Sequence, residues 1–374
     1  MNMNHHAFRI FAIAFASFST SQANDFETED FSLRFSAALS RLSTFGDVSG
    51  QSGASAASVR STSLNPAALA WRPLIDGEGH RLSLALSGQY NGLFFDRGAQ
   101  IDAISQSMSF YPAENWALKL SATQLRSNEE PLRSGLVYEV DLNAWRLDIA
   151  HRFSRRFALG IQLAYSESET NATLGQFKRD SDRRSFAVRF GWQVSLLPGT
   201  LAALRIDPKA SPATSTPNDN RLLAALVFDY VNQPTKLGTF TPFGSTVERR
   251  EYQQFLVRGG LAWNYINAPW GGSETARRSG FVRLDYQWGW FFSPASELQV
   301  HRLYLGGDYP ITPFLHANAG VNLDARRNIS WSAGLSFLTH TVALEAAYQH
   351  DLLPEIGRDF GHADVVVVSV GYAF

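Results

Sequence analysis

The sequence predicts an all-β chain that forms a transmembrane antiparallel β-barrel of about 14 strands with an N-terminal plug. Three observations predict this fold. Apolar and polar residues alternate in segments of about nine to fourteen residues, near the length that a tilted strand needs to cross a bilayer. The opposite faces of these segments hold mainly Gly, Ala, Ser or charged residues, which suit a crowded lumen. The apolar faces carry large aromatic residues near their ends, as an interfacial girdle does: Trp116, Tyr165, Trp263, Tyr265, Trp288 and Trp290.

A soluble β-sandwich is the alternative, because apolar and polar residues also alternate along its strands, with the apolar faces packed inside. The aromatic girdles and the strand lengths favour the barrel. The segment 363–374 shows why the barrel must close. A strand edge in lipid would leave backbone groups without hydrogen-bond partners, so this last strand has to pair with the first. Its apolar face continues to the final residue and consists of Val366, Val368, Val370, Tyr372 and Phe374.

An even number of strands places both ends of the sheet on the periplasmic side. Turns on that side are predicted to be short, as at 112–115 and 154–156, whereas 197–220 is a long connection with four prolines. The predicted strands are 80–91, 98–111, 115–126, 134–153, 157–170, 185–196, 221–232, 251–266, 280–292, 297–309, 314–324, 329–338, 341–351 and 363–374.

The segment 134–153 changes its parity. Leu136 to Leu142 place apolar residues on one face, whereas Trp145 to Phe153 place them on the other. A β-bulge near Asn143–Ala144 would restore both halves to one face and keeps the strand number even, so we expect a bulge there. Two strands joined by a tight outer turn are the alternative.

Residues 1–23 are predicted to be a secretory signal peptide, with a short charged start, an apolar core and a cleavage site after Ala23. A buried N-terminal helix is the alternative. No later segment has about 18 consecutive apolar residues, so no transmembrane helix is expected. The chain has no cysteine, which excludes a small disulfide-stapled domain, and its net charge of −1 argues against a nucleic-acid partner.

Residues 24–79 lack barrel periodicity and are predicted to form a periplasmic or hatch segment before the barrel at 80–374. The stretch 45–73 is rich in Gly, Ser and Ala, and its side chains are too small to build a core of their own. This stretch is either disordered or fills the lumen, since a fourteen-strand lumen is too wide for wall side chains alone to fill.

The small-residue run, the motif SLNPAAL and a barrel that ends in aromatic residues together resemble the FadL-type family of long-chain fatty acid and hydrocarbon channels. The chain is also similar to the related PorV-type outer-membrane proteins. The resemblance implies that Asn65, Pro66 and Ala67 form the hatch motif inside a fourteen-strand barrel, and that hydrophobic substrates leave through a gap in the wall. It further implies that Tyr372 and Phe374 belong to the signal that the barrel-assembly machinery recognises.

The outer loops depart from that family. Several have only about four to seven residues, such as Ser127–Arg133 and Ser293–Ser296. The family's fatty acid channels carry long outer loops that form a capture groove, and only 171–184, 233–250 and 352–362 are candidates for such loops here.

The predicted lumen face carries charges of both signs in similar number. Interior ion pairs that stabilise the barrel and anchor the hatch are the expected role, because an ion-selective pore would show one dominant sign at a constriction. The alternatives are such a pore or a pocket for hydrophobic ligands. The predicted lumen charges are Lys119, Glu139, Asp141, Arg146, Asp148, Arg189, Arg258, Arg283, Asp285 and Glu345.

No catalytic residue, metal site or cofactor is predicted, so the chain is expected not to be an enzyme. A membrane-embedded hydrolase is the least favoured hypothesis, because no nucleophile and base form a recognisable pattern. One acidic and histidine-containing stretch could offer cation ligands, yet its spacing matches no defined site, so a solvated loop is expected. That stretch contains His350, Asp351, Glu355, Asp359, His362 and Asp364.

The predicted function is a passive outer-membrane channel for hydrophobic or amphipathic, fatty-acid-like small molecules in a Gram-negative cell. The alternative is a docking barrel of the PorV type, in protein secretion or surface attachment. The expected partners are the outer-membrane bilayer, lipopolysaccharide, the barrel-assembly machinery and hydrophobic small molecules.

Overall fold

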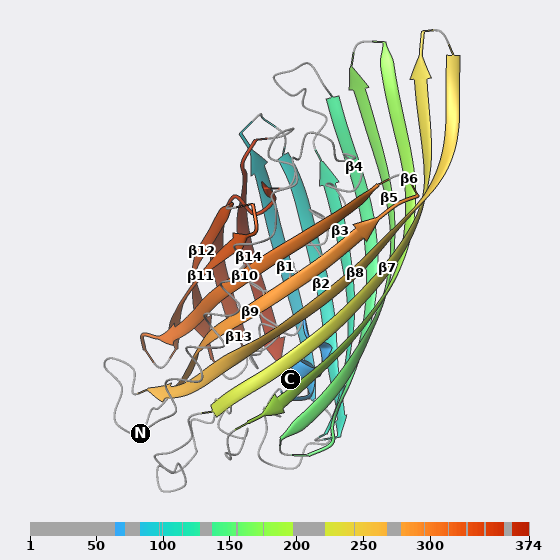
Figure 1. Cartoon of the computed structure of the whole chain (residues 1–374). Coiled ribbons are helices and arrows are strands. Elements are labelled where there is room, and N and C mark those ends of the chain that lie inside the picture. The colour runs from blue at the N-terminus through green and yellow to red at the C-terminus, as the bar shows by residue number, and fades with distance from the viewer. Residues whose placement is uncertain are drawn as a thin grey trace, which may run out of the picture.

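Fourteen antiparallel strands form one closed barrel, in which β1 pairs with β14 and every other strand pairs with its neighbours in sequence (Figure 1). This computed structural model describes residues 64–71 and most of 83–373, with gaps longer than one residue at 128–136, 197–220, 268–277, 340–341 and 355–360. No helix in the described ranges is long and apolar enough to cross a membrane. The prediction of a closed fourteen-strand barrel is confirmed.

Besides the strands, the described residues contain one 3-10 helix, η3 (Pro66–Trp71). The strands are β1 (Ser83–Phe95), β2 (Gln100–Ala113), β3 (Trp116–Ser127), β4 (Val137–Arg152), β5 (Phe157–Leu174), β6 (Phe177–Ser195), β7 (Arg221–Thr241), β8 (Gly244–Asn267), β9 (Arg278–Phe292), β10 (Glu297–Pro310), β11 (Leu315–Asp324), β12 (Ile329–Leu338), β13 (Val342–His350) and β14 (Ala363–Ala373).

The apolar faces of the strands point away from the barrel axis. On β14, Val366, Val368 and Val370 are 39%, 45% and 51% exposed, whereas their neighbours Val365 and Val367 are buried. Side chains alternate along a strand, so the same parity applies to each strand. An exposed apolar belt on a closed barrel is a surface for hydrocarbon, and the prediction that the apolar faces are turned to lipid agrees with this orientation.

The barrel is taller on one side. Figure 1 shows the β5–β6 and β7–β8 hairpins rising beyond the other strands at the extracellular end, opposite the end where β1 begins and β14 ends. The predicted outer loops at 171–184 and 233–250 are therefore wrong, because these residues continue the strands up to short turns. Strands can extend above the membrane where their outer faces are polar and meet water, as Glu167, Glu169 and Arg184 do here.

The predicted β-bulge in β4 is also wrong. Residues 137–152 pair with β5, and residues 141–151 with β3, in one uninterrupted register. Val140 and Leu142 consequently face the lumen, whereas Glu139 and Asp141, which we predicted in the lumen, lie on the outer face. Asp141 forms an exposed ion pair there with Arg126, at 3.4 Å. The parity change marks the height at which the outer environment changes from lipid to water.

Every strand of the described wall pairs with both of its neighbours, and the β6–β7 ladder skips only Arg184 and Ser185, opposite Pro234 and Gln233. One register shift occurs there, between Phe110 and Ala113 in β2, close to the turn into β3. The lateral gap that the family resemblance implies is not present between the described strands. The signal peptide at 1–23, the long connection at 197–220, Phe374 and most of the segment 24–79 lie outside the described residues.

Candidate functional site in the barrel lumen

The inner wall changes its chemistry along the barrel axis. Register pairs inward residues of neighbouring strands directly, so that they form rows around the wall. Rows near the extracellular end are apolar over part of the circumference, rows at middle height are charged, and rows near the periplasmic end are made of small residues that contact η3.

A first apolar surface, the mouth patch, covers the inner wall of β14 and β1–β4 at the extracellular end. Val365, Leu93 and Ile101 are consecutive partners in one row. Ala103 and Leu125 are partners in the next row, and all five side chains are at least 93% buried. We define the mouth patch as Leu93, Phe95, Ile101, Ala103, Leu125, Val140, Ala363, Val365 and Val367, all of them buried.

A second apolar cluster lies on the inner wall of β8, β9 and β10. Tyr252, Leu256, Phe291, Leu298 and Val300 pack together, and each is buried. Inward positions on these strands belong to the lumen face by the same alternation that places Trp263 outside. Two separate walls of the lumen therefore present apolar side chains.

A row of alternating charges crosses the wall from β3 to β7, below the mouth patch on β3 and β4, and its next register partner on β8 is Leu256 of the second apolar cluster. Lys119, Asp148, Gln162, Arg189 and Asp229 are consecutive register partners from β3 to β7. The Gln162 Nε2 donates to Asp148 Oδ1 at 2.5 Å, and the Arg189 guanidinium donates to Asp229 Oδ2 at 2.6 Å and 3.2 Å. The last four of these residues are at least 94% buried. The predicted interior ion pairs are present in this row.

A second polar network lies on β8–β10. The Arg258 Nε donates to Gln287 Oε1 at 2.9 Å, and the Tyr304 hydroxyl donates to the same oxygen at 3.2 Å. The guanidinium of Arg258 also lies 5.3 Å from the centroid of the Tyr304 ring. Buried Arg283 and Asp285, which are on the predicted list, are inward residues of the adjoining β9. The inward charged side chains therefore form ion pairs and hydrogen bonds with inward side chains of neighbouring strands, and these contacts link the strands of the wall.

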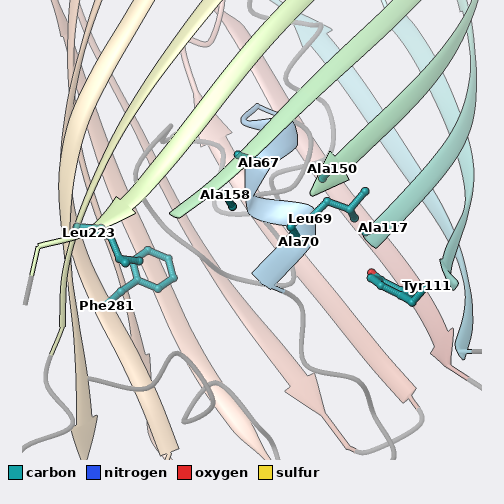
Figure 2. Packing of buried hydrophobic residues seen from close by; sticks show 10 residues of the cluster. Ala67, Leu69, Ala70, Tyr111, Ala117, Ala150, Ala158, Leu223 and Phe281 are labelled. Atoms are coloured by element: carbon teal, nitrogen blue, oxygen red, sulfur yellow. The ribbon is translucent and has the colours of Figure 1, made fainter. Parts of the chain in front are cut away.

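The turn that contains Asn65, Pro66 and Ala67, which we predicted to be a hatch motif, packs against the inner side of β3–β6 (Figure 2). Its contact at Gly160 lies two residues from Gln162 of the charged row, toward the periplasmic start of β5. Asn65 is fully buried and holds the turn with its side chain. Its Oδ1 accepts a hydrogen bond from the Ala67 backbone N–H at 3.0 Å, and its Nδ2 donates to the Trp192 carbonyl oxygen at 3.3 Å. Asparagine suits this position because a short amide can bridge its own backbone and a neighbour.

Two glycines of the wall receive this turn, and the sequence analysis missed them. Gly160 on β5 and Gly191 on β6 are register partners and both face inward. A Cβ at Gly160 would overlap the backbone of Pro66 and Ala67, and a Cβ at Gly191 would overlap the Asn65 side-chain oxygen. We call this pair the glycine socket. The sequence signal that could have indicated this contact is a pair of inward glycines at matching positions of two adjacent strands.

The surroundings of the socket are small and apolar. Figure 2 shows Ala67, Leu69 and Ala70 of the turn beside Ala150 and Ala158 of the wall. These alanines let the backbone of the turn approach the strands closely. The remaining members of the cluster are Tyr111, Ala117, Leu223, Ala262 and Phe281.

The other predicted residues are not part of the lumen site. Tyr372 faces outward on β14 and is 45% exposed. At the rim, His350 Nδ1 lies 2.8 Å from Asp364 Oδ1, and His362 Nδ1 lies 3.4 Å from Asp351 Oδ1. Within the described ranges, no group of three or more His, Asp or Glu side chains is arranged to hold a metal ion.

Comparison with known proteins gives similarity in structure but not in sequence. No family model matches the chain, and no curated protein sequence matches it. The CymD monoaromatic hydrocarbon channel aligns with a TM-score of 0.50 at 13% identity, covering 88% of this chain and 96% of that one. The toluene transporter TodX of Pseudomonas putida aligns with a TM-score of 0.51 at 10% identity, covering 89% and 98%. The predicted resemblance to FadL-type channels is thus confirmed for the fold, which is that of an outer-membrane barrel.

Proposed function

We propose that the chain is an outer-membrane channel for passive uptake of hydrophobic or amphipathic small molecules, and that the turn at Asn65–Ala67 belongs to a plug. The observation that carries this proposal is the change of the inner wall of β1–β5 and β14 from apolar at the mouth to charged at middle height, with the turn at Pro66–Trp71 packed against β3–β6 below. A solute that enters from outside meets these three levels in that order.

The mouth patch and the β8–β10 cluster would supply the capture step once a solute displaces the parts of the chain that now bury these side chains. An apolar wall inside the mouth lowers the free energy of an apolar solute by about 25 cal/mol for each Å² that leaves water. Leu125 and Val140 lie where the outer face of the wall is polar, so their apolar character serves the inside of the barrel rather than contact with lipid.

The charged row argues against an ion pore. Its cations and anions are register neighbours that pair with each other, as Arg189 does with Asp229, and no single sign dominates it. An ion-selective constriction needs one sign. The inward polar residues form ion pairs and amide contacts, which supports transport rather than catalysis.

The plug is anchored rather than loosely packed. Asn65 joins the turn to β6 and the glycine socket accepts its backbone, so a solute would pass by displacement of neighbouring plug residues and leave through the lumen. Continuous strand pairing supports a lumen route over a lateral one.

Small aromatic hydrocarbons are the first probes to use, because CymD and TodX are described as channels for such compounds. Cells that produce the full chain should take up radiolabelled toluene faster than cells without it. Leu125→Asn, which places an amide in the mouth patch, should lower the initial rate several-fold. Arg126→Gln changes the adjacent outward residue, 67% exposed, and should leave the rate unchanged.

Folding of both variants is checked by heat-dependent migration on gels. Equal uptake with and without the chain would contradict the channel, as would unchanged permeability after deletion of residues 36–72. Either result would leave protein docking as the better hypothesis.

A further inference from the structure

A furrow of about 880 Å³ crosses the wall from β14 through β1 to β6. Its walls are two rows of register partners. One row runs through Leu86, Met108, Leu120, Leu147 and Leu163. The other runs through Gly88, Gln106, Ala122, Trp145, Tyr165 and Phe186. A volume of this size is in the range of sites that hold an organic ligand.

The furrow lies on the outer, lipid-facing surface. Both of its rows consist of outward positions, as the exposure of Leu120, Trp145 and Phe186 shows. The inward residues that line it, such as Ser121, come from the single row between these two, where their backbone forms the floor. A lumen cavity would also touch the next inward rows on either side, but Ser109 of one row and Thr123 of the other do not line the furrow.

Small residues give the furrow its depth. A Cβ at Gly88 would find no atom within 4 Å, and Ala122 lies two strands away in the same row. On the far side, the rings of Trp145 and Tyr165 stack with their centroids 6.1 Å apart and form a raised edge. The furrow is thus bounded by leucines on one side and by aromatic rings on the other.

The furrow spans the depth of one leaflet. It begins beside Tyr372, one residue before β14 ends at the periplasmic side, and rises to Tyr165, eight residues after β5 begins. At about 3.3 Å per residue and a tilt near 40°, this height is roughly 20 Å. The hydrocarbon core is about 30 Å thick, with its midplane about 15 Å from either interface, so the furrow reaches from the periplasmic interface to a little beyond the midplane.

We infer that this furrow is a binding site for one acyl chain of a phospholipid from the periplasmic leaflet. Hydrocarbon is the only solvent that this belt meets, and an acyl chain anchored at the periplasmic interface extends over about 15 Å, which is most of this depth. Recognition is by shape, because the side chains that form the two walls carry no charge. The site lies outside the lumen and does not depend on the proposed transport.

The test fills the furrow and leaves the lumen unchanged. Ala122→Trp adds a large ring at the low stretch of the wall row that contains Gly88 and Ala122. Ala333→Trp is the matched control, since Ala333 is an exposed outward alanine on β12 that does not line the furrow. The full-length barrels are purified in mild detergent, and the lipid that each retains is identified by native mass spectrometry.

Wild type and Ala333→Trp should each retain one phospholipid per barrel, and Ala122→Trp should lose at least 80% of that signal. Equal retention by the two variants, no retained lipid in wild type, or retained lipid A or hydrocarbon instead of phospholipid would each overturn the proposal. Toluene uptake by Ala122→Trp should equal that of wild type, so failure of this site and failure of the channel are distinguishable. Heat-dependent gel migration verifies that both variants fold.

Discussion

At the scale of single residues, the glycine socket explains why an Asn-Pro-Ala turn can lie against a β-sheet. Gly160 leaves room for the backbone of Pro66 and Ala67, and Gly191 leaves room for the side chain of Asn65, where any other residue would place a Cβ. The segment Asn65–Ala67 could be singled out from sequence because its residues are contiguous, and its role as a hatch stays a prediction. The socket could not, because it depends on the register between β5 and β6 and on where a distant segment docks against them.

Gly160→Ala should dislodge the turn, because its Cβ would overlap the backbone of Pro66 and Ala67, and overpacking of this kind costs about 1–3 kcal/mol. We expect a several-fold higher open-channel conductance in planar bilayers and faster proteolysis near Asn65. Gly88→Ala is the control, because it adds the same methyl group where no atom lies within 4 Å. If the two variants behave alike in both assays, the socket does not anchor the turn.

The buried pair Arg189–Asp229 carries a second prediction at this scale. Asp229→Leu should lower the free energy of unfolding by about 3–5 kcal/mol, because it removes the carboxylate at 2.6 Å from a buried guanidinium. The double variant Arg189→Met/Asp229→Leu should recover most of this loss. Urea unfolding in lipid vesicles measures both. A double variant as unstable as the single one would show that the pair is not an isolated unit.

At the scale of elements, the sequence predicted all fourteen strands but not their lengths. Alternation of apolar and polar residues identifies a strand only along the part whose outer face meets lipid. Above the membrane that face becomes charged, and residues 171–184 and 233–250 then resemble loops in sequence although they pair as strands. The same change of solvent produced the apparent bulge in β4, where Glu139 and Asp141 face water. The mouth patch was missed because its residues are scattered over five strands, and of these residues only Val140 was read as part of an outward apolar face.

The tall β7–β8 hairpin should be dispensable for folding. Replacing Leu237–Glu248 by an Asn-Gly turn removes pairs that lie above the lipid, where water can satisfy the freed backbone groups. We expect the free energy of unfolding to change by about 1 kcal/mol or less. Circular dichroism and heat-dependent gel migration check that the barrel forms. Loss of the barrel would mean that the extension is part of the folding core.

At the scale of the whole molecule, the barrel divides three solvents: lipid outside, water above and a crowded interior. The loss of unfolding free energy caused by an arginine on the outer face should depend on whether that position meets lipid or water. Val368→Arg lies near the middle of β14 and should cost about 2–4 kcal/mol of unfolding free energy. Val247→Arg lies on the tall hairpin, 62% exposed, and should cost less than about 0.5 kcal/mol. Similar costs at both positions would place the membrane boundary elsewhere.

The seam between β1 and β14 sets the order in which this barrel can be made. Eleven residue pairs join these two strands. The backbone groups on the free edge of β1 therefore find their hydrogen-bond partners only when β14 is in place. Contacts of such long sequence separation form slowly. A partly synthesised chain therefore has no stable inserted state in hydrocarbon, because one strand edge stays unpaired. Insertion into the bilayer is expected to follow completion of the polypeptide and to occur as a single event.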